Sequence, residues 1–294
     1  MNVDFAAYVA RRRQAAPGDR GEGYAYVGDL RVRRALKTVR PVELAVTHTV
    51  KLAQSFLNSE LLGGAVKVGP QQFTRLHEIA GRCAGLLGIP RPTVYVVPRI
   101  DAINAATFGT EDDSFIMVNS ATMDYLTDEE LTFIIGHECG HIQNNHVVYL
   151  TTLHLLTQMA RAVLGLVLAP LIYPATLALQ SWSRAAEITC DRAGLLCCRD
   201  LSVGIRAFVK LAVSNQRLFD EINLDAYLDQ LRQGQDAGLG RLGELGRSHP
   251  YLPKRVEHLR IFADSALYRA AVGGEGGLTR EELERQTADL VKVV

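Results

Sequence analysis

The chain has 294 residues, of which 48% are hydrophobic and 22% charged, and its 32 basic residues balance 32 acidic ones. This composition is typical of a globular protein and excludes a disordered or collagen-like chain. A formal net charge of zero lacks the basic excess of most nucleic-acid-binding proteins, so we expect no nucleic-acid partner.

The cysteines and the N-terminus point to an intracellular location. Five cysteines lie scattered along the chain without the spacing of a disulfide scaffold, which favours a reducing compartment. No apolar run precedes Arg11–Arg13, so a cleaved secretory signal is not expected, and the first residues fit an amphipathic helix instead. We therefore expect a cytoplasmic protein.

The first third of the chain predicts helices. Residues 41–60 carry a proline in their first turn and are followed by Gly63-Gly64, which ends that helical region. Residues 70–87 form a second predicted helix, which closes at Gly88 before an Ile-Pro break.

Three short strands follow these helices. Residues 93–98, 104–108 and 114–119 are rich in β-branched and aromatic side chains, and little sequence separates them. They predict a small, mostly antiparallel sheet. The chain is thus expected to be an α+β protein that is mainly helical.

Helical patterns resume after the sheet. Thr127–Glu130 form a capping box, in which the threonine caps the helix and the glutamate reaches back to it. A second capping box, Thr279–Glu282, begins the last helix. Further helices are predicted over 181–199, 201–214, 216–232 and 253–263, with a glycine-rich linker at 234–246.

One uncharged apolar stretch covers residues 162–179. Its length is at the lower limit of a membrane span, which needs about 20 apolar residues. Pro170 and Pro174 are expected to break it into a helical hairpin that is buried or dips into a surface. The favoured prediction is a cytoplasmic protein or one attached peripherally to the inner membrane, and a true membrane span by 162–179 is the alternative.

The feature that decides the chemistry is H-E-C-G-H at His137–His141. Its two histidines are four residues apart, so they share one face of the predicted helix and can bind one metal ion. Glu138 lies one residue round the helix, where it suits a general base acting on water. The motif alone also fits two ordinary histidines on a helix.

A second group of residues lies 46 positions beyond His141. Glu187 and Asp191 are four apart and share a helical face, so one can bind the metal and the other can orient a histidine ligand. Small residues occur on both helices, at Gly136 and Gly140 on the first and around Gly194 on the second. Helices lined in this way can approach closely.

These motifs together resemble the HtpX-like zinc metallopeptidases, relatives of the CAAX prenyl endopeptidases in the gluzincin group. The resemblance runs from about Pro90 to Leu259. It is carried by G-I-P-R-P-T-V-Y-V, N-A-A, H-E-C-G-H, E-I-T-C-D-R-A-G and S-H-P followed by K-R.

The resemblance implies a role for each matching residue. His137, His141 and Glu187 would bind one Zn²⁺ per chain, and Glu138 would be the general base. Asp191 would contact a ligand from outside the metal site. Asn104 would contact the substrate backbone, and His249 would face the oxyanion. The metallopeptidase domain is then expected over 70–264, with a helical region at 1–69 packed on it and a helical tail at 265–294.

Other chemically interesting residues are expected to be structural. Cys139 points away from the metal-binding face, and Cys197 and Cys198 fit small buried side chains. His146 is expected at the surface or in a helix cap. Trp182 is expected to pack at the base of the metal-binding helix.

We therefore predict a zinc endopeptidase, with a possible role in protein quality control, that acts on protein or peptide substrates. An extended peptide would add a strand at the sheet edge near 114–119. The alternative is a catalytically inactive, metal-stapled module that binds client proteins. The sequence leaves the oligomeric state open.

Overall fold

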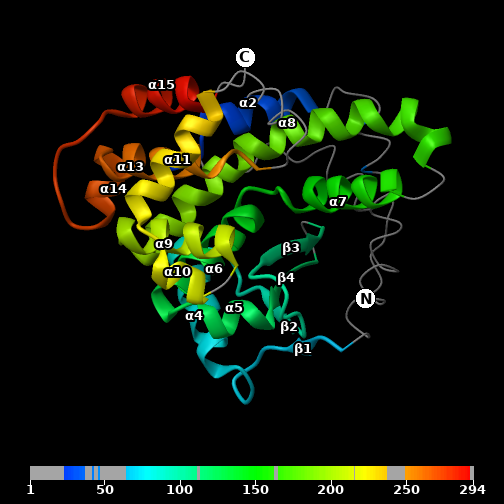
Figure 1. Cartoon of the computed structure of the whole chain (residues 1–294), viewed down its shortest axis with the longest axis horizontal. Coiled ribbons are helices and arrows are strands. Elements are labelled where there is room, and N and C mark those ends of the chain that lie inside the picture. Colours follow the sequence, from blue (N-terminus) through cyan, green and yellow to red (C-terminus); the bar gives the residue numbers. More distant parts are fainter. Residues whose placement is uncertain are drawn as a thin grey trace.

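A computed structural model describes residues 23–36, 42, 46, 64–110, 113–161, 165–214, 216–236 and 249–291. Helices dominate this part of the chain, and one small sheet lies low in the view of Figure 1, below α7 and beside α5 and α6. The α+β class is therefore confirmed. The predicted helices over 1–14 and 41–60 and the linker at 234–246 fall wholly or mostly outside the described residues.

The sheet has four strands in the order β1-β2-β4-β3. They are β1 (Val66–Lys67), β2 (Thr93–Val97), β3 (Ala105–Gly109) and β4 (Ser114–Asn119). The pairs β1–β2 and β3–β4 are antiparallel, whereas β2–β4 is parallel. The mostly antiparallel sheet is confirmed, and only the two-residue β1 was not predicted.

The predicted substrate edge near 114–119 is wrong. β4 lies inside the sheet, with Ile116 paired to Val94 of β2 on one side and to Thr107 of β3 on the other. The edges of the described sheet are instead the two-residue β1 and strand β3, and β3 lies nearest to α7 in Figure 1. The order of strands depends on long-range pairing, which a run of β-branched residues does not specify.

Two helices flank the sheet. Helix α4 (Thr74–Leu87) ends at Gly88, whose φ of 65° is the left-handed conformation of a helix C-cap. Helix α6 (Asp128–Gln143) begins with the predicted capping box, in which Thr127 and Glu130 bond to each other's backbone. Short helix α5 (Ser120–Tyr125) joins the sheet to α6. One continuous core runs through α4, the sheet and α6.

The apolar stretch belongs to a long helix. Helix α7 (Val147–Arg161) is followed by α8 (Gly165–Cys198), a single helix that includes both Pro170 and Pro174. The predicted break at the prolines is therefore wrong: each proline removes one hydrogen bond, and neighbouring leucines and alanines favour the helix on both sides. Within the described residues, no helix is long and apolar enough to cross a membrane.

The C-terminal half consists of helices that cover the end of α8. They are α9 (Leu201–Val213), α10 (Gln216–Glu221), α11 (Leu224–Asp236), α13 (Leu252–Ala263), α14 (Ala266–Ala271) and α15 (Arg280–Val291). The predicted helix over 216–232 is thus two helices. The capping box at the start of α15 is present, because the Thr279 backbone N–H donates to Glu282. The proposed division into domains stays a prediction.

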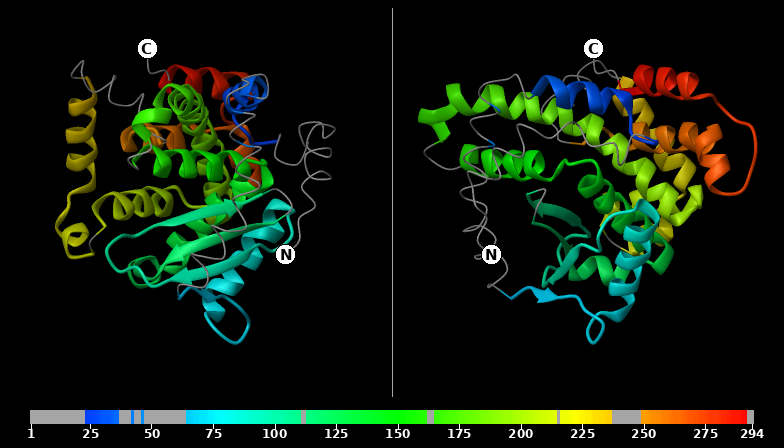
Figure 2. Two further views of the ribbon diagram at one scale, coloured as in Figure 1. Left: turned by 90° about the vertical axis from the view of Figure 1, so that its right-hand side faces the viewer. Right: turned by 180° about the vertical axis from the view of Figure 1, so that it is seen from behind.

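The N-terminal part of the described chain packs on α8. Helix α2 (Val27–Leu36) lies beside it in both Figures 1 and 2, and a second hydrophobic cluster joins α2, α7 and the middle of α8. Trp182 of α8 is fully buried in this cluster, and its indole N–H donates to Asp29 of α2. Residues from the start of the chain thus reach the helix that carries Glu187.

Helices α6 and α8 pack unusually closely, as the small residues on both predicted. A Cβ at Gly140 would lie 2.8 Å from that of Ala193, and one at Gly136 would lie 2.7 Å from that of Cys197. At Gly194 an added Cβ would lie 2.7 Å from the carbonyl oxygen of Phe133. The backbone of each helix therefore touches the other.

Gly194→Ala should destabilise the protein, because its new methyl group meets backbone that cannot rotate away. Overpacking of this kind costs about 1–3 kcal/mol. The matched control is Gly85→Ala in α4, where an added Cβ meets nothing within 4 Å. That substitution should raise the melting temperature, since alanine is the better helix former. Equal melting temperatures for the two variants would contradict the close packing.

Candidate functional site

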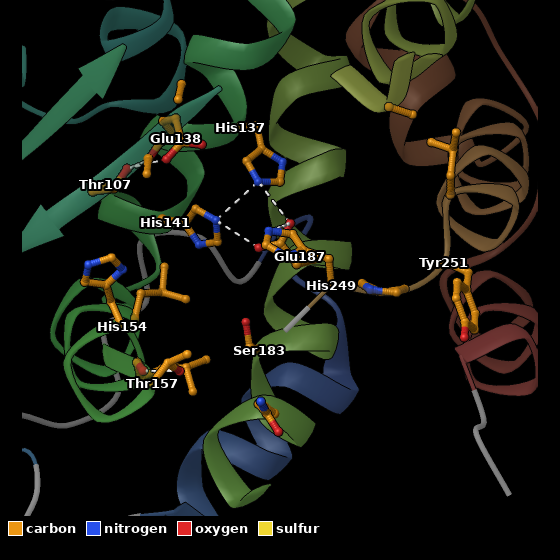
Figure 3. A pocket seen from close by; sticks show the side chains of 18 of the residues that line it. Thr107, His137, Glu138, His141, His154, Thr157, Ser183, Glu187, His249 and Tyr251 are labelled. Atoms are coloured by element: carbon orange, nitrogen blue, oxygen red, sulfur yellow. Dashed lines mark hydrogen bonds and ion pairs between the residues drawn. The ribbon is translucent and has the colours of Figure 1, made fainter. Parts of the chain in front are cut away.

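The two motif histidines and Glu187 come together where α6 meets α8. His137 Nε2 and His141 Nε2 are 3.2 Å apart, and they lie 3.4 and 3.5 Å from the two carboxylate oxygens of Glu187. Figure 3 shows the two rings and the carboxylate converging on one point. All three side chains are buried. Helical spacing predicted that His137 and His141 share one face of α6 and that Glu187 and Asp191 share one face of α8. The close packing of the two helices brings these faces together.

This arrangement fits a zinc ion. Tetrahedral ligands about 2.0–2.1 Å from Zn²⁺ lie roughly 3.3 Å from one another, close to the three distances observed. Glu187 Oε2 is enclosed and has no well-aligned hydrogen bond among the described residues. Arg255 lies 3.2 Å from this oxygen, but one guanidinium does not neutralise both Glu187 and Asp191, so burial of the two carboxylates favours a further cation. Two imidazole nitrogens and one carboxylate are also a donor set that zinc prefers.

A second layer of contacts supports His137 and Glu187. Asp191 Oδ1 lies 3.0 Å from His137 Nδ1, on the side of the ring that faces away from Glu187. Arg255 of α13 makes a bidentate pair with Asp191, at 2.5 and 3.0 Å, and also lies 3.2 Å from Glu187. Its guanidinium stacks over Phe208, 4.3 Å from the ring centre. The sequence suggested the role of Asp191 but not that of Arg255.

These buried charges shift one another's pKa. Burial by itself raises the pKa of Glu187, but His249 and His137 outweigh it and hold that pKa well below its usual value. Burial likewise opposes ionisation of Asp191, whose pKa Arg255 and His137 lower. For His137, burial lowers the pKa, but Glu187 and Asp191 outweigh burial and raise it to about 10. Both carboxylates are therefore ionised at neutral pH and attract a cation.

Glu138 lies beside the three converging groups and is held in place from the sheet. Thr107 of β3 donates a hydrogen bond of 2.6 Å to Glu138 Oε2, and Figure 3 shows this pair next to His137 and His141. The same hydroxyl lies 3.3 Å from the Glu138 carbonyl oxygen. This contact joins the edge strand β3 directly to helix α6. No local sequence pattern indicates Thr107, because its partner lies 31 residues away.

His249 reaches the same site from the segment before α13. Its Nε2 lies 3.5 Å from Glu187 Oε2, and 60% of its side chain is exposed. Asn104 lies at the start of β3, where its backbone N–H and carbonyl bond to Thr122. It is exposed and does not line the cavity described below. The expected role of His249 at the oxyanion and that of Asn104 on the substrate backbone stay predictions.

His146 was expected at the surface or in a helix cap, and this prediction is wrong, because the side chain is fully buried. Its Nδ1 lies 3.1 Å from Nδ1 of His141, and its Nε2 lies 3.0 Å from Asp29 of α2. His146 follows a turn in which Asn145 has a φ of 55°, and this turn sends the chain back toward His141. Helical spacing beyond His141 does not apply there, because α6 ends at Gln143. Cys139 and Trp182 are buried, as expected.

A cavity of about 880 Å³ opens at this site. Figure 3 shows His154, Thr157 and Ser183 on one side of the converging groups and Tyr251 beyond His249 on another. The cavity is lined by Ala105–Phe108 of β3, His137, Glu138, His141, Leu150, Leu153, His154, Thr157, Gln180, Ser183, Glu187, Ala212, Tyr227, Gln230 and His249–Pro253. An edge strand, a candidate base and a cation site therefore share one open space.

Arg255→Met should destabilise the protein, because it leaves two buried carboxylates without their cation. Breaking a buried ion pair costs about 3–5 kcal/mol. The control is Arg260→Met on the same helix, where a partly exposed arginine pairs with Glu257 at 3.4 Å and contributes about 1 kcal/mol or less. Urea unfolding of both variants gives the comparison, and losses of equal size would contradict the role assigned to Arg255.

Comparison with known proteins identifies the family. The model of peptidase family M48 matches residues 70–263. The plastoglobule-localised metallopeptidase 48 of Arabidopsis thaliana chloroplasts is 31% identical, over 74% of this chain and 65% of its own length. Protease HtpX homologues of Streptococcus pneumoniae and Salinibacter ruber are 25% and 24% identical, over 81% and 69% of this chain and 90% and 79% of theirs. No solved structure matches the chain. The chain therefore belongs to peptidase family M48, and within it the chain is similar to the HtpX proteases.

Proposed function

We propose that this metallopeptidase is a zinc-dependent endopeptidase. Its zinc site would consist of His137, His141 and Glu187, with one ion per chain. The observation that carries the proposal is the convergence of two imidazole nitrogens and a buried carboxylate on one point, with Glu138 beside them and an open cavity in front. A zinc ion bound there would polarise the scissile carbonyl and acidify the attacking water.

Glu138 would act as the general base. It lies in the cavity wall next to the three proposed ligands, and the Thr107 hydroxyl holds one carboxylate oxygen at 2.6 Å. The other oxygen is left to take the proton of the attacking water and pass it to the departing amine. His249 would donate a hydrogen bond to the oxyanion, a role that suits its position across the site from α6.

The substrate would bind as an extended strand along β3. Ala105 and Ala106 line the cavity, so the small side chains of this edge leave space for another backbone to approach. Pairing with an edge strand presents a peptide backbone without selecting its sequence. Side chains of the substrate would then enter the space near Leu153 and His154 or that near Tyr227 and Tyr251.

Cellular setting remains a proposal that the relatives support only by name. One relative is localised to plastoglobules, and others are HtpX proteases. This chain spans 65% of the length of the plastoglobule protein. We propose a role in protein quality control for a cytoplasmic or peripherally membrane-attached protease.

The competing proposal is a metal-stapled module that binds client proteins without cleaving them. A structural zinc site normally closes its fourth position with another protein ligand. Here the space in front of the three proposed ligands is an open cavity that contains a buried carboxylate, Glu138. That carboxylate favours the enzyme, because a structural site has no use for a base.

Glu187→Ala should lose most of the bound zinc, because it removes one of three proposed ligands. Asp191→Ala should weaken zinc binding by about 10–100-fold, the usual effect of losing a contact that orients a ligand. Metal content and competition with a chelator measure both. Full zinc retention by Glu187→Ala would show that another residue is the ligand.

Glu138→Gln separates catalysis from metal binding. The amide keeps the size of the side chain but removes the base, so peptide hydrolysis should fall by at least about 10²–10⁴-fold. Zinc content and melting temperature should stay close to those of the parent protein, which serves as the control together with Glu187→Ala. Unchanged hydrolysis by a zinc-loaded Glu138→Gln protein would end the endopeptidase proposal and favour the client-binding module.

A further inference from the structure

Each motif histidine uses one ring nitrogen at the proposed zinc site and leaves the other facing the protein interior. In His137 this second nitrogen is Nδ1, which faces the carboxylate of Asp191. A carboxylate at this distance usually accepts the N–H of a ligand histidine and fixes its ring. Among the described residues, no hydrogen bond or ion pair joins Nδ1 of His141 to a carboxylate. This nitrogen faces another imidazole, that of His146, at 3.1 Å.

A carboxylate lies one step further out. Asp29 Oδ2 lies 3.0 Å from His146 Nε2, and both side chains are fully buried. Two donors from α8 hold the carboxylate: Trp182 Nε1 at 3.0 Å on Oδ1 and Thr189 Oγ1 at 2.8 Å on Oδ2. Asp29, His146 and His141 therefore form a chain of contacts that starts on α2 and ends at the proposed zinc site.

The Asp29 carboxylate determines which ring nitrogen of each histidine in this chain carries the proton. An ionised carboxylate only accepts hydrogen bonds, so Asp29 holds the proton of a neutral His146 on Nε2. The Nδ1 atom of His146 then carries a lone pair. His141 Nδ1 is the nearer donor to this lone pair, at 3.1 Å against 3.6 Å for Cys190 Sγ, so the proton is assigned to His141, which leaves the lone pair of His141 on Nε2. That atom is the one that faces His137 and Glu187.

We propose that Asp29 and His146 are positioning residues, which hold His141 in the tautomer and orientation that bind zinc through Nε2. This inference rests on the proposed zinc site. It gives the buried Asp29–His146 pair a role in metal binding, and it explains why a segment 108 residues before the H-E-x-x-H motif packs against the metal-binding helices.

A second metal ion is the alternative explanation for the same cluster. His141, His146 and Cys190 form a group of ligand atoms close enough to share an ion, with Cys190 Sγ 3.1 Å from His141 Nδ1 and 3.6 Å from His146 Nδ1. Such an ion would need a thiolate and a His141 ring without any N–H, bridging two metals. Burial and nearby carboxylates raise the pKa of Cys190, so its thiol is the favoured form without a metal, and the zinc content of Cys190→Ala distinguishes the two explanations.

Asp29→Asn tests whether the carboxylate sets the tautomers of His146 and His141. The amide can donate to His146 Nε2, which moves the proton of His146 to Nδ1 and that of His141 to Nε2, the wrong atom for zinc binding. Zinc affinity should then fall by about 10–100-fold. His146→Leu should have a similar effect, whereas His146→Asn, whose amide oxygen can replace Nδ1 as the acceptor, should restore most of the affinity.

The decisive readout is the tautomer, measured from the imidazole ¹⁵N chemical shifts of the full-length protein without zinc. His141 should carry its proton on Nδ1 and His146 on Nε2 in the parent protein, and Asp29→Asn should reverse both. His258→Asn is the matched control, because His258 is equally buried but accepts a hydrogen bond from Arg192. It should leave the tautomer of His141 unchanged.

Three results would overturn this inference. One is an Nε2–H tautomer of His141 in the zinc-free parent protein. Another is unchanged zinc affinity in both Asp29→Asn and His146→Leu; if Glu187→Ala still lost zinc, the proposed zinc site itself would stand. The third is a second equivalent of bound zinc that Cys190→Ala removes, which would establish a second metal ion in place of the hydrogen-bonded chain.

Discussion

The structure depends on the close contact between α6 and α8. Glycines at 136, 140 and 194 let the two backbones meet, and an added methyl group at any of them would overlap the other helix. This contact brings the His137–His141 face of one helix to the Glu187–Asp191 face of the other. A separation larger by the width of one side chain would part the imidazoles from the carboxylate. The candidate site is therefore a consequence of how two helices pack.

That close contact concentrates charge inside the protein, and the surrounding elements compensate it. Two ionised carboxylates, Glu187 and Asp191, lie at the junction, and Arg255 from α13 pairs with both. One guanidinium does not neutralise two carboxylates, and Glu187 Oε2 has no well-aligned hydrogen bond among the described residues, so the site remains short of positive charge. A site built in this way is preorganised for a divalent cation. Asp191 of α8 contacts His137, and His146 contacts His141. Arg255 of α13 and Asp29 of α2 lie one step further out, against Asp191 and His146.

Contacts within one helix could be predicted from the sequence, and those between distant segments could not. The spacing of His137 and His141, that of Glu187 and Asp191, and the capping box at Thr127 all depend on helical geometry alone, so the sequence predicts them directly. Asp29 and Thr107 act on the site through partners far along the chain, and no local pattern reveals them. The edge of the sheet was misplaced for the same reason, because strand order is set by long-range pairing. Pro170 and Pro174 misled the prediction in the opposite way: a strong local signal for a break was overridden within a long helix.

X-ray absorption at the zinc edge of the loaded protein tests the central claim most directly. Ligation by His137, His141 and Glu187 predicts one zinc per chain with only nitrogen and oxygen neighbours, at about 2.0–2.2 Å, and the multiple-scattering signal of two imidazoles. A sulfur neighbour at about 2.3 Å would contradict this account, because it would place the metal at Cys190, outside the open cavity that contains Glu138.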